Sequence, residues 1–471
     1  MRSRHALLAS MLVLMAAGCV DERVVYRDRD LLDGLATGAG GFVGYSNADS
    51  KLTVCGNCHV SQQNQWVETA HAGAFVTLAT SGSQRALCEG CHTVGEKGND
   101  SQGSGGHAAT GEGRYRDVQC ESCHGPGEPH VRNPDGGTSQ QMLARIDAAP
   151  DANGTCAECH SGFHHPFVEE WAASGHGTVV ASPAGNPSCA GCHEGKAVLQ
   201  AFGVLSDYKE QGQAGHIAIT CAVCHDPHRK RFEGQLRYSI SIPDEEQNLC
   251  MRCHHKRGGP DMTAPTRGPH SPEGPMLLGE AGWWPPNMPT DSRIVGTHGS
   301  EANPRMCAGC HVQSYSITDP QSGNATMVTT GHLFEAIPCF DANGQPTRDD
   351  SCAFETRTFR TCTSAGCHGS QNAARSALVV ARARIDNLNN QLKSQLARIP
   401  AAEFSSSDNR YTTAEGTRFN SQLADRSGSA VHNPFLMEAL LIASIQQIQV
   451  EYGIFPGAGI SLQRELKGHA D

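Results

Sequence analysis

The chain has 471 residues and a formal net charge of −11 at pH 7, which argues against nucleic acid as a partner. Hydrophobic residues make up only 38 %, and there are 52 glycines and 24 prolines. This composition argues against a disordered chain and against a conventional apolar core, and it predicts much irregular backbone.

The N-terminus has the features of an export signal. Arg2 and Arg4 precede an apolar run over 6–17, which at about 12 residues is shorter than the roughly 20 needed to span a bilayer. The run ends in small residues before Cys19. We therefore predict a lipoprotein-type signal peptide over 1–18 and a lipid on Cys19. Ordinary cleavage that leaves a free thiol is the alternative, because the usual leucine three places before the cysteine is absent.

Residues 19–54 are interpreted as a solvated tether, since a charged run over 21–30 is followed by a glycine-rich stretch. The protein should then be exported and lipid-anchored. Val20 follows the lipid-bearing cysteine where many inner-membrane lipoproteins carry aspartate. This favours the outer membrane, at its periplasmic or extracellular face.

One short pattern recurs along most of the remaining chain. CxxCH occurs eight times, and a stretched ninth copy, CTSAGCH, follows; we number these motifs 1 to 9 in chain order. The motif cysteines are Cys55 and Cys58, Cys88 and Cys91, Cys120 and Cys123, Cys156 and Cys159, Cys189 and Cys192, Cys221 and Cys224, Cys250 and Cys253, Cys307 and Cys310, and Cys362 and Cys367. The motif histidines are His59, His92, His124, His160, His193, His225, His254, His311 and His368.

The pattern predicts covalently bound haem c. The two thiols of CxxCH add across the haem vinyl groups, and the next histidine binds the iron from one face. Zinc knuckles or dithiol redox pairs share the cysteine spacing but give no reason for the histidine. We expect nine haems, or eight at minimum, because the longer spacer of motif 9 must bulge. A disulfide or free thiols are the alternative there.

Motif spacing indicates an internal duplication. From Cys55, and again from Cys156, the next two motifs start 33 and then 32 residues later. Two trihaem units, 55–130 and 156–230, joined by a polar linker over 131–155, are the simplest explanation. Each unit also has WxxxxH after its first motif: Trp66 with His71, and Trp171 with His176.

A third haem-binding portion, 231–370, carries motifs 7 to 9 at wider spacing. Its proline-rich insertions predict loops that wrap haem. Cys339 and Cys352 lie outside the motifs, 13 residues apart. We expect a disulfide between them in an oxidising compartment, with two unpaired buried thiols as the alternative.

The last segment, 371–471, lacks CxxCH and changes character. Apolar residues at 3,4 spacing predict an amphipathic helix over 377–399. A second helix should begin with Asn433 as N-cap and Pro434 at its first position, and stop at Gly453. We expect an antiparallel hairpin packed on the haem body or on another subunit. The predicted fold class is mainly α with extensive irregular coil: a haem-packed multihaem cytochrome c fold with a C-terminal helical hairpin.

The histidines outside the motifs are numerous enough to bind the second face of every iron. We assign three to unit 1, three to unit 2 and four to the rest, with His164, His165, His255 and His469 in reserve. Two imidazoles hold iron closed to substrate, so that it only passes electrons. The ten candidates are His71, His107 and His130; His176, His216 and His228; and His270, His298, His332 and His432.

Several stretches resemble a known group of proteins. The segment CESCHGPGEPH over 120–130, CHDPH over 224–228 and the WxxxxH segments are similar to multihaem cytochromes grouped around the nitrifiers' tetrahaem cytochrome, hydroxylamine oxidoreductase and pentahaem nitrite reductase. The resemblance implies closely packed haem pairs and a continuous electron path. His432 looks similar to the histidine that reaches a haem at the start of a C-terminal helix in the enzymes. The CxxCK site of the nitrite reductases is absent from this sequence.

Three functions are compatible with these features. The first is an electron carrier that relays electrons between a redox donor and an acceptor protein or an external acceptor; a filament of stacked subunits is a sharper version. The second is a reductase or oxidase of a nitrogen or sulfur compound with one open haem. The third is a structural subunit that docks an enzyme through the C-terminal hairpin. We favour the first.

Overall fold

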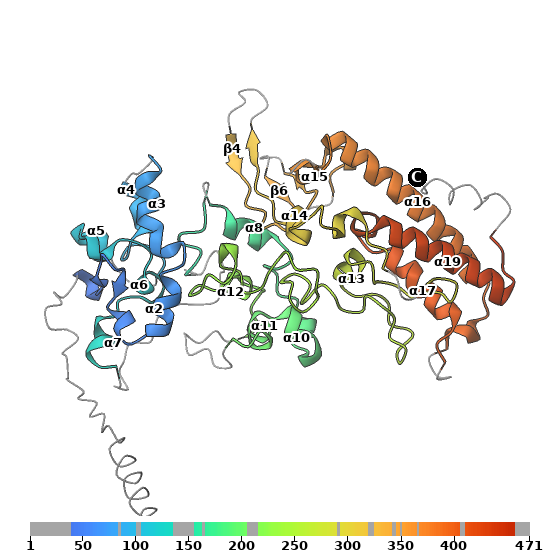
Figure 1. The fold of residues 1–471 in the computed structure, drawn as a ribbon, viewed down its shortest axis with the longest axis horizontal. Helices are drawn as coiled ribbons and strands as arrows, with labels where there is room; N and C mark the ends of the chain where they lie inside the picture. Colours follow the sequence, from blue (N-terminus) through green and yellow to red (C-terminus); the bar gives the residue numbers. More distant parts are fainter. Residues whose placement is uncertain are drawn as a thin grey trace, which may run out of the picture.

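A computed structural model describes residues 39–82, 86–99, 105–134, 155–162, 165–204, 215–289, 293–318, 325–341, 345–348, 351–364, 367–405 and 410–456. The molecule is elongated, and its elements follow the long axis roughly in chain order (Figure 1). The expected signal peptide, Cys19, most of the tether and most of the linker lie outside the described residues. In the described part of the chain, no helix combines the length and apolar character needed to cross a membrane.

The first trihaem unit is built from short helices and one small antiparallel sheet, as expected of a chain rich in glycine and proline. Its sheet comes from residues 39–54, which were predicted to belong to a solvated tether. They pack on the unit instead, with strands β1 Tyr45–Asn47 and β2 Leu52–Thr53, because apolar side chains such as Phe42 and Tyr45 are buried against it. Its 3₁₀ helices are η1 Ala39–Gly41, η2 Cys55–Asn57, η3 His71–Gly73 and η4 Gly113–Tyr115. Its α-helices are α2 Val60–Trp66, α3 Ala74–Thr80, α4 Ala86–His92, α5 Gly106–Thr110, α6 Cys120–His124 and α7 Glu128–Arg132.

The second unit and the third portion also consist mainly of short helices joined by irregular backbone. The second unit contains α8 Phe167–Ala173, α9 Ala181–Ala184, α10 Pro187–His193, α11 Gly195–Ala201 and α12 Cys221–Cys224. The third portion contains η5 Glu233–Gln235, α13 Glu273–Leu277, η6 Thr297–Gly299, α14 Met306–His311, η7 Phe354–Thr356 and α15 Arg360–Thr363. Two hairpins lie within it: β3 Ser316–Thr318 with β4 Ala325–Val328, and β5 Cys339–Phe340 with β6 Pro346–Thr347.

The two units repeat the same internal contacts. The indole nitrogen of Trp66 donates to the carbonyl oxygen of Val118 at 3.0 Å, and the Val118 amide donates to His71 O at 3.1 Å. Both contacts join the WxxxxH segment to the residue two places before the third motif of the unit. In the second unit the same positions are Trp171, Ile219 and His176, at 2.8 and 3.0 Å. Sequence spacing and geometry therefore point to the same duplication.

The C-terminal segment is a bundle of three packed helices rather than the predicted two. The long helices are α16 Gln371–Leu396 and α19 Pro434–Tyr452, and α17 Thr413–Ala424 packs against both of them (Figure 1). Asn433 is the N-cap of α19 and Gly453 ends it with φ 64°, as predicted. The remaining elements here are η9 Ala401–Phe404 and α18 Ser429–His432.

Helix α17 was not predicted, because most of its buried residues are small or polar, such as Thr417, Asn420 and Ser421. The signal that could have found it is Thr412-x-x-Glu415, a capping box. The Thr412 hydroxyl accepts from the Glu415 amide at 3.2 Å, and the Glu415 carboxylate accepts from the Thr412 amide at 2.9 Å.

The bundle docks on the third portion through buried amide side chains. Asn420 accepts from the Trp283 amide and donates to the Trp283 carbonyl oxygen, both at 2.7 Å. Gly416 lies flat against the Trp283 indole, where any side chain would collide with the ring. The bundle also contains the largest apolar cluster among the described residues. The motif-bearing units have clusters of only three or four buried residues, which leaves their interiors dependent on a bulky apolar ligand.

Candidate haem-binding sites

Each motif folds into one tight turn that brings its histidine back over its first cysteine. In motif 1 the His59 amide donates to Cys55 O at 2.9 Å, and in motif 4 the His160 amide donates to Cys156 O at 2.9 Å. Motif 9 closes the same way despite its longer spacer, since the His368 amide donates to Cys362 O at 3.1 Å. The longer spacer therefore leaves the contact between the motif's histidine and its first cysteine in place.

Eight of the nine motif histidines face a second histidine ring. The ring centroids are 6.0 to 6.3 Å apart in every pair. The pairs, motif histidine first, are His59 with His130, His124 with His228, His160 with His71, His193 with His270, His225 with His332, His254 with His176, His311 with His432, and His368 with His298.

This separation suits one metal atom held between two imidazoles. A metal–imidazole bond of about 2.0 Å plus about 1.1 Å from ring nitrogen to ring centre, taken on both sides, gives roughly 6.2 Å. Directly stacked or hydrogen-bonded rings have no reason to repeat that spacing eight times. The residues therefore fit haem iron with histidine on both faces.

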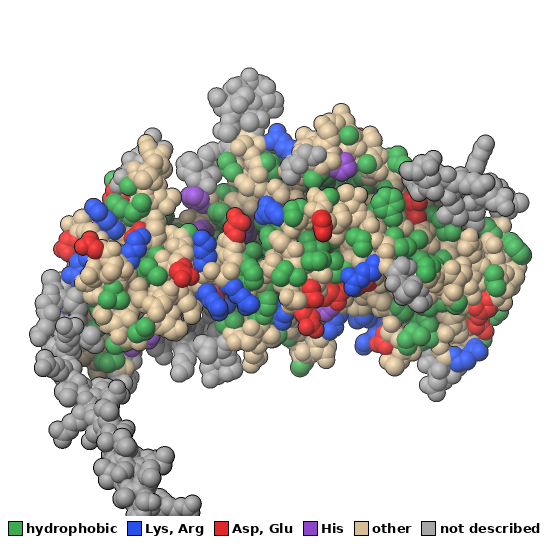
Figure 2. Space-filling model, in the orientation of Figure 1, with side chains coloured by type: hydrophobic (Ala, Val, Ile, Leu, Met, Phe, Trp, Pro, Cys, Tyr) green, Lys and Arg blue, Asp and Glu red, His purple; other side chains and the backbone are tan. Residues whose placement is uncertain are grey.

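Burial keeps these imidazoles in the neutral form that a metal ligand requires. Desolvation lowers the pKa of His124, His160 and His432 to about 4 each. It lowers the pKa of His176 and His332 to about 4 as well. Figure 2 agrees with this burial, since histidine is visible at only a few places on the face shown, among interspersed acidic and basic side chains.

The histidine pairs cross the unit boundaries, unlike the expectation that each unit supplies its own partners. Within the two trihaem units, only His130 faces a motif histidine of its own unit, His59. In the rest of the chain, His298 and His432 also face motif histidines of the third portion, as assigned. His71 of unit 1 instead faces His160 of unit 2, and His228 of unit 2 faces His124 of unit 1. The reason is that the WxxxxH loop is anchored to the end of its unit and points beyond it. Successive units are thereby interlocked.

Two of the ten predicted partner histidines are placed elsewhere. His107 lies against Phe75, with ring centroids 5.7 Å apart, and its Nδ1 is 3.7 Å from a Glu89 carboxylate oxygen. His216 is exposed. Of the reserve histidines, His165 stacks on Phe167 and His255 contacts Met251 O through Nδ1 at 2.6 Å. His164 and His469 lie outside the described residues.

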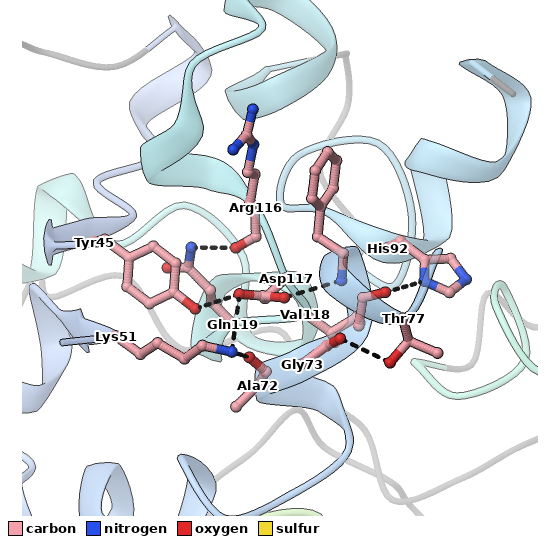
Figure 3. Close-up of polar contacts among 12 residues, drawn as sticks. Tyr45, Lys51, Ala72, Gly73, Thr77, His92, Arg116, Asp117, Val118 and Gln119 are labelled. Carbon is pink, nitrogen blue, oxygen red and sulfur yellow. Dashed lines mark hydrogen bonds and ion pairs between the residues drawn. The ribbon is translucent and has the colours of Figure 1, made fainter. Parts of the chain in front are cut away.

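Motif 2 differs from the others, because no histidine ring among the described residues faces His92. Its Nδ1 contacts the carbonyl oxygen of Ala74 at 2.8 Å, which orients the ring and leaves Nε2 for a metal (Figure 3). The neighbouring Phe75 amide donates to Asp117 at 2.9 Å. Asp117 is buried, has φ 69°, and also accepts from the Tyr45 hydroxyl at 2.9 Å. This network fixes the chain beside motif 2, and sequence reasoning did not identify it.

A carboxylate contacts one motif histidine. Glu273, at the start of α13, lies 3.5 Å from Nδ1 of His254 in motif 7. The Glu273 carboxylate raises the pKa of His254, whereas burial lowers the pKa of His225 and several partner histidines. Other motif histidines use backbone carbonyls at this position, as His311 does with Phe334 O at 2.8 Å. A carboxylate makes imidazole a stronger electron donor to iron, so Glu273 should stabilise the oxidised state at motif 7.

We expect Glu273→Gln to raise the midpoint potential of one haem, by up to about 60 mV, the one-electron equivalent of a tenfold shift. Gln keeps the shape and removes the charge. Optical spectroelectrochemistry of the whole protein measures the shift, with exposed Glu233→Gln as the matched control. Identical redox titrations of both variants would contradict this role.

Cys339 and Cys352 are joined by a disulfide with an S–S distance of 2.06 Å. The bond links β5 to the segment before η7, beside motif 9. Every other cysteine of the described residues belongs to a motif. Cys58 and Cys367 are exposed, and the remaining motif cysteines are partly buried.

Comparisons with known proteins agree with the motif analysis over parts of the chain. The family model described as cytochrome c554 and c-prime matches residues 54–125, which contain motifs 1 to 3. A model of the doubled CXXCH motif matches residues 216–259, which contain motifs 6 and 7. Searches of curated proteins and of solved structures found no match. With the repeated motifs, these matches support haem c as the cofactor and electron transfer as its role. Over the matched residues the chain is therefore similar to multihaem c-type cytochromes, in agreement with the motifs in the rest of the sequence.

Proposed function

We propose that this protein is an electron carrier that holds nine haems and relays electrons outside the cytoplasm. It would be lipid-anchored at the outer membrane through Cys19, and it would accept electrons from a redox protein and pass them to another or to an external acceptor. Copies stacked into a filament are compatible with this role. Nucleic acid is not an expected partner.

The observation that supports this proposal most strongly is the set of eight histidine pairs at 6.0 to 6.3 Å. Iron held between two imidazoles has no free position for a substrate, and it changes oxidation state with little rearrangement. The chain contributes by fixing both rings, excluding water through burial, and keeping the imidazoles neutral. Eight such sites in one chain are suited to long-range electron transfer and not to catalysis that makes or breaks bonds of a substrate.

Intact mass and low-temperature EPR test the proposal together. The mass of the mature protein should correspond to nine haems and a lipid on Cys19. EPR of the oxidised protein should show low-spin ferric signals from eight sites with two imidazole ligands. A protein that lacks haem, or whose ferric sites are mostly high-spin, would refute the proposal.

A second candidate function rests on motif 2. Because His92 faces no other histidine within the described part of the chain, iron held there would have one side open. The protein would then be a reductase or oxidase of a nitrogen or sulfur compound, with the other sites supplying electrons. A single high-spin ferric signal that disappears on adding nitrite or hydroxylamine, with turnover of that compound, would favour it. Nine low-spin sites would exclude it.

A further inference from the structure

We propose that the nine motifs form a line of seven, in the order 1, 3, 4, 6, 7, 8 and 9, with motif 2 beside motif 4 and motif 5 beside motif 7. Electrons enter and leave at the two ends of this line, motifs 1 and 9. This spatial order of the motifs differs from their order in the sequence. The proposal rests on the proposed electron-transfer function, and it specifies which motifs every electron must pass.

The first support is the approach of cysteine thiols from different motifs. A thioether sulfur sits one carbon from the porphyrin edge, so two neighbouring sulfurs bring two porphyrin edges together whatever the tilt of the rings. Cysteine side chains of different motifs are neighbours between motifs 1 and 3, 2 and 4, 4 and 6, 5 and 7, and 7 and 8. The Cys91 sulfur of motif 2, for example, lies 4.0 Å from Glu158 O of motif 4, and Ala157 of motif 4 packs with Cys221 of motif 6. The pairs are Cys55 with Cys120, Cys91 with Cys159, Cys156 with Cys221, Cys192 with Cys253, and Cys250 with Cys307.

The remaining links of the line are longer approaches. Motifs 3 and 4, for example, meet at Gly98, where an added side chain would contact both Ser122 O of motif 3 and the Cys159 sulfur of motif 4. Cys123 of motif 3 also acts electrostatically on Cys156 and Cys159 of motif 4. Cys224 of motif 6 acts on both cysteines of motif 7. Cys310 of motif 8 interacts with both cysteines of motif 9, and the helices of these motifs, α14 and α15, pack together. Close and longer approaches therefore alternate along the line.

Two phenylalanines provide independent geometric support at its centre. The Phe167 ring lies 5.6 Å from His160, which belongs to motif 4, and 4.9 Å from His332, which faces motif 6. The Phe334 ring lies 5.7 Å from His332 and 4.5 Å from His176, which faces motif 7. Each ring thus contacts the axial histidines of two neighbouring motifs of the line. Motifs 4, 6 and 7 are consecutive by this criterion as well.

Contacts beside the thiols support the other links. Gly98, which follows motif 2, donates from its amide to the Glu158 carboxylate of motif 4 at 2.8 Å. Thr53, before motif 1, lies 3.8 Å from the sulfur of Cys120 in motif 3. Met251 of motif 7 and Cys307 of motif 8 share one apolar cluster. The branch at motif 2 and both end regions of the line are therefore placed by more than one contact.

Exposure identifies the ends. Cys58 of motif 1 and Cys367 of motif 9 are exposed, whereas the other motif cysteines are partly buried. These are the two motifs that end the line. In Figure 1, α2, which follows motif 1, lies in the N-terminal part at the left, and α15, which holds Cys362 of motif 9, lies well to the right of it. Electrons would flow along the line when a one-electron donor docks at one end and a one-electron acceptor docks at the other. Each iron passed is reduced and then reoxidised, and no bond is made or broken.

Two matched substitutions test the order. Histidine–methionine ligation raises the potential of haem iron, so it converts a site into an electron trap. His332→Met acts on motif 6, in the line, and His270→Met acts on motif 5, a branch. Both histidines are half-buried and both come from the third portion. Both variants are made in a parent carrying Asp49→Cys, in the exposed turn before motif 1, and His298→Ala. His298→Ala removes one axial imidazole at motif 9, which raises its potential and gives this sink a high-spin spectrum distinct from that of the histidine–methionine trap.

A ruthenium photosensitiser on the introduced cysteine supplies the electron. The excited label gives one electron to the protein, and a reductant in solution restores the label. Transient absorption then follows reduction of the motif 9 sink. We expect His332→Met to slow this step at least tenfold, which a trap of about 59 mV produces for one electron. His270→Met should leave the rate within about twofold of the parent rate.

Intact mass and spectroelectrochemistry first establish that each variant keeps its haems and gains one high-potential site. His228→Met, which acts on motif 3 of the line, replaces His332→Met where that variant loses haem. Equal slowing by the branch and line substitutions, or slowing by His270→Met alone, overturns the order. A parent protein in which no electron moves beyond motif 1 refutes the proposed electron-transfer function instead.

Discussion

Replacing His130 by alanine is expected to convert the motif 1 haem from low-spin to high-spin and to open it to exogenous ligands. His130 faces His59 at 6.3 Å, so its loss leaves that iron with one axial imidazole. EPR of the oxidised protein should gain a high-spin ferric signal of one site beyond the unmodified protein. The reduced variant should bind one additional equivalent of carbon monoxide.

The matched control for this substitution is His216→Ala. His216 was an equally good partner candidate in the sequence, but it is exposed and faces no motif histidine among the described residues. The control should have the spectrum and carbon monoxide stoichiometry of the unmodified protein. A high-spin signal from His216→Ala, or none from His130→Ala, would contradict the pairing of axial ligands.

Replacing Asn433 by alanine is expected to destabilise the C-terminal bundle by about 3–5 kcal/mol. Asn433 is fully buried; its oxygen accepts from the Leu436 amide at 3.0 Å, and its amide group donates to Met276 O at 3.1 Å and Ile294 O at 2.5 Å. The substitution removes the N-cap of α19 and leaves two carbonyls of the third portion without this donor. Because His432 is the preceding residue, part of the motif 8 haem should also become high-spin.

Asn186→Ala provides a control with the same local sequence. Asn186 precedes Pro187 and caps α10 by accepting from the Ser188 amide at 2.9 Å, but its side chain is exposed. This cap alone should contribute about 1 kcal/mol. Denaturant unfolding followed by far-UV circular dichroism compares the two. Equal losses of stability would show that Asn433 acts only as a cap and does not dock the bundle.

The sequence alone was sufficient for features that are written locally. The CxxCH motif contains both haem-attaching cysteines and one iron ligand within five residues. The eighteen motif cysteines and nine motif histidines could therefore be predicted without knowledge of the fold. The N-cap at Asn433 and the stop at Gly453 were equally local, because a side-chain cap and a left-handed glycine act within one turn. The repeat of 33 and 32 residues indicated the duplication, which the matching contacts of Trp66 and Trp171 reproduce.

Only the tertiary structure decided which distant residues meet. His107 and His216 were as plausible as His71 by sequence, yet His71 alone of these faces a motif histidine, in the next unit. Glu273 beside His254, and Phe167 between His160 and His332, are brought together from separate loops. The physical reason is that an axial ligand must approach iron from outside the motif. Nothing within the motif specifies where that ligand comes from, so chain packing chooses it.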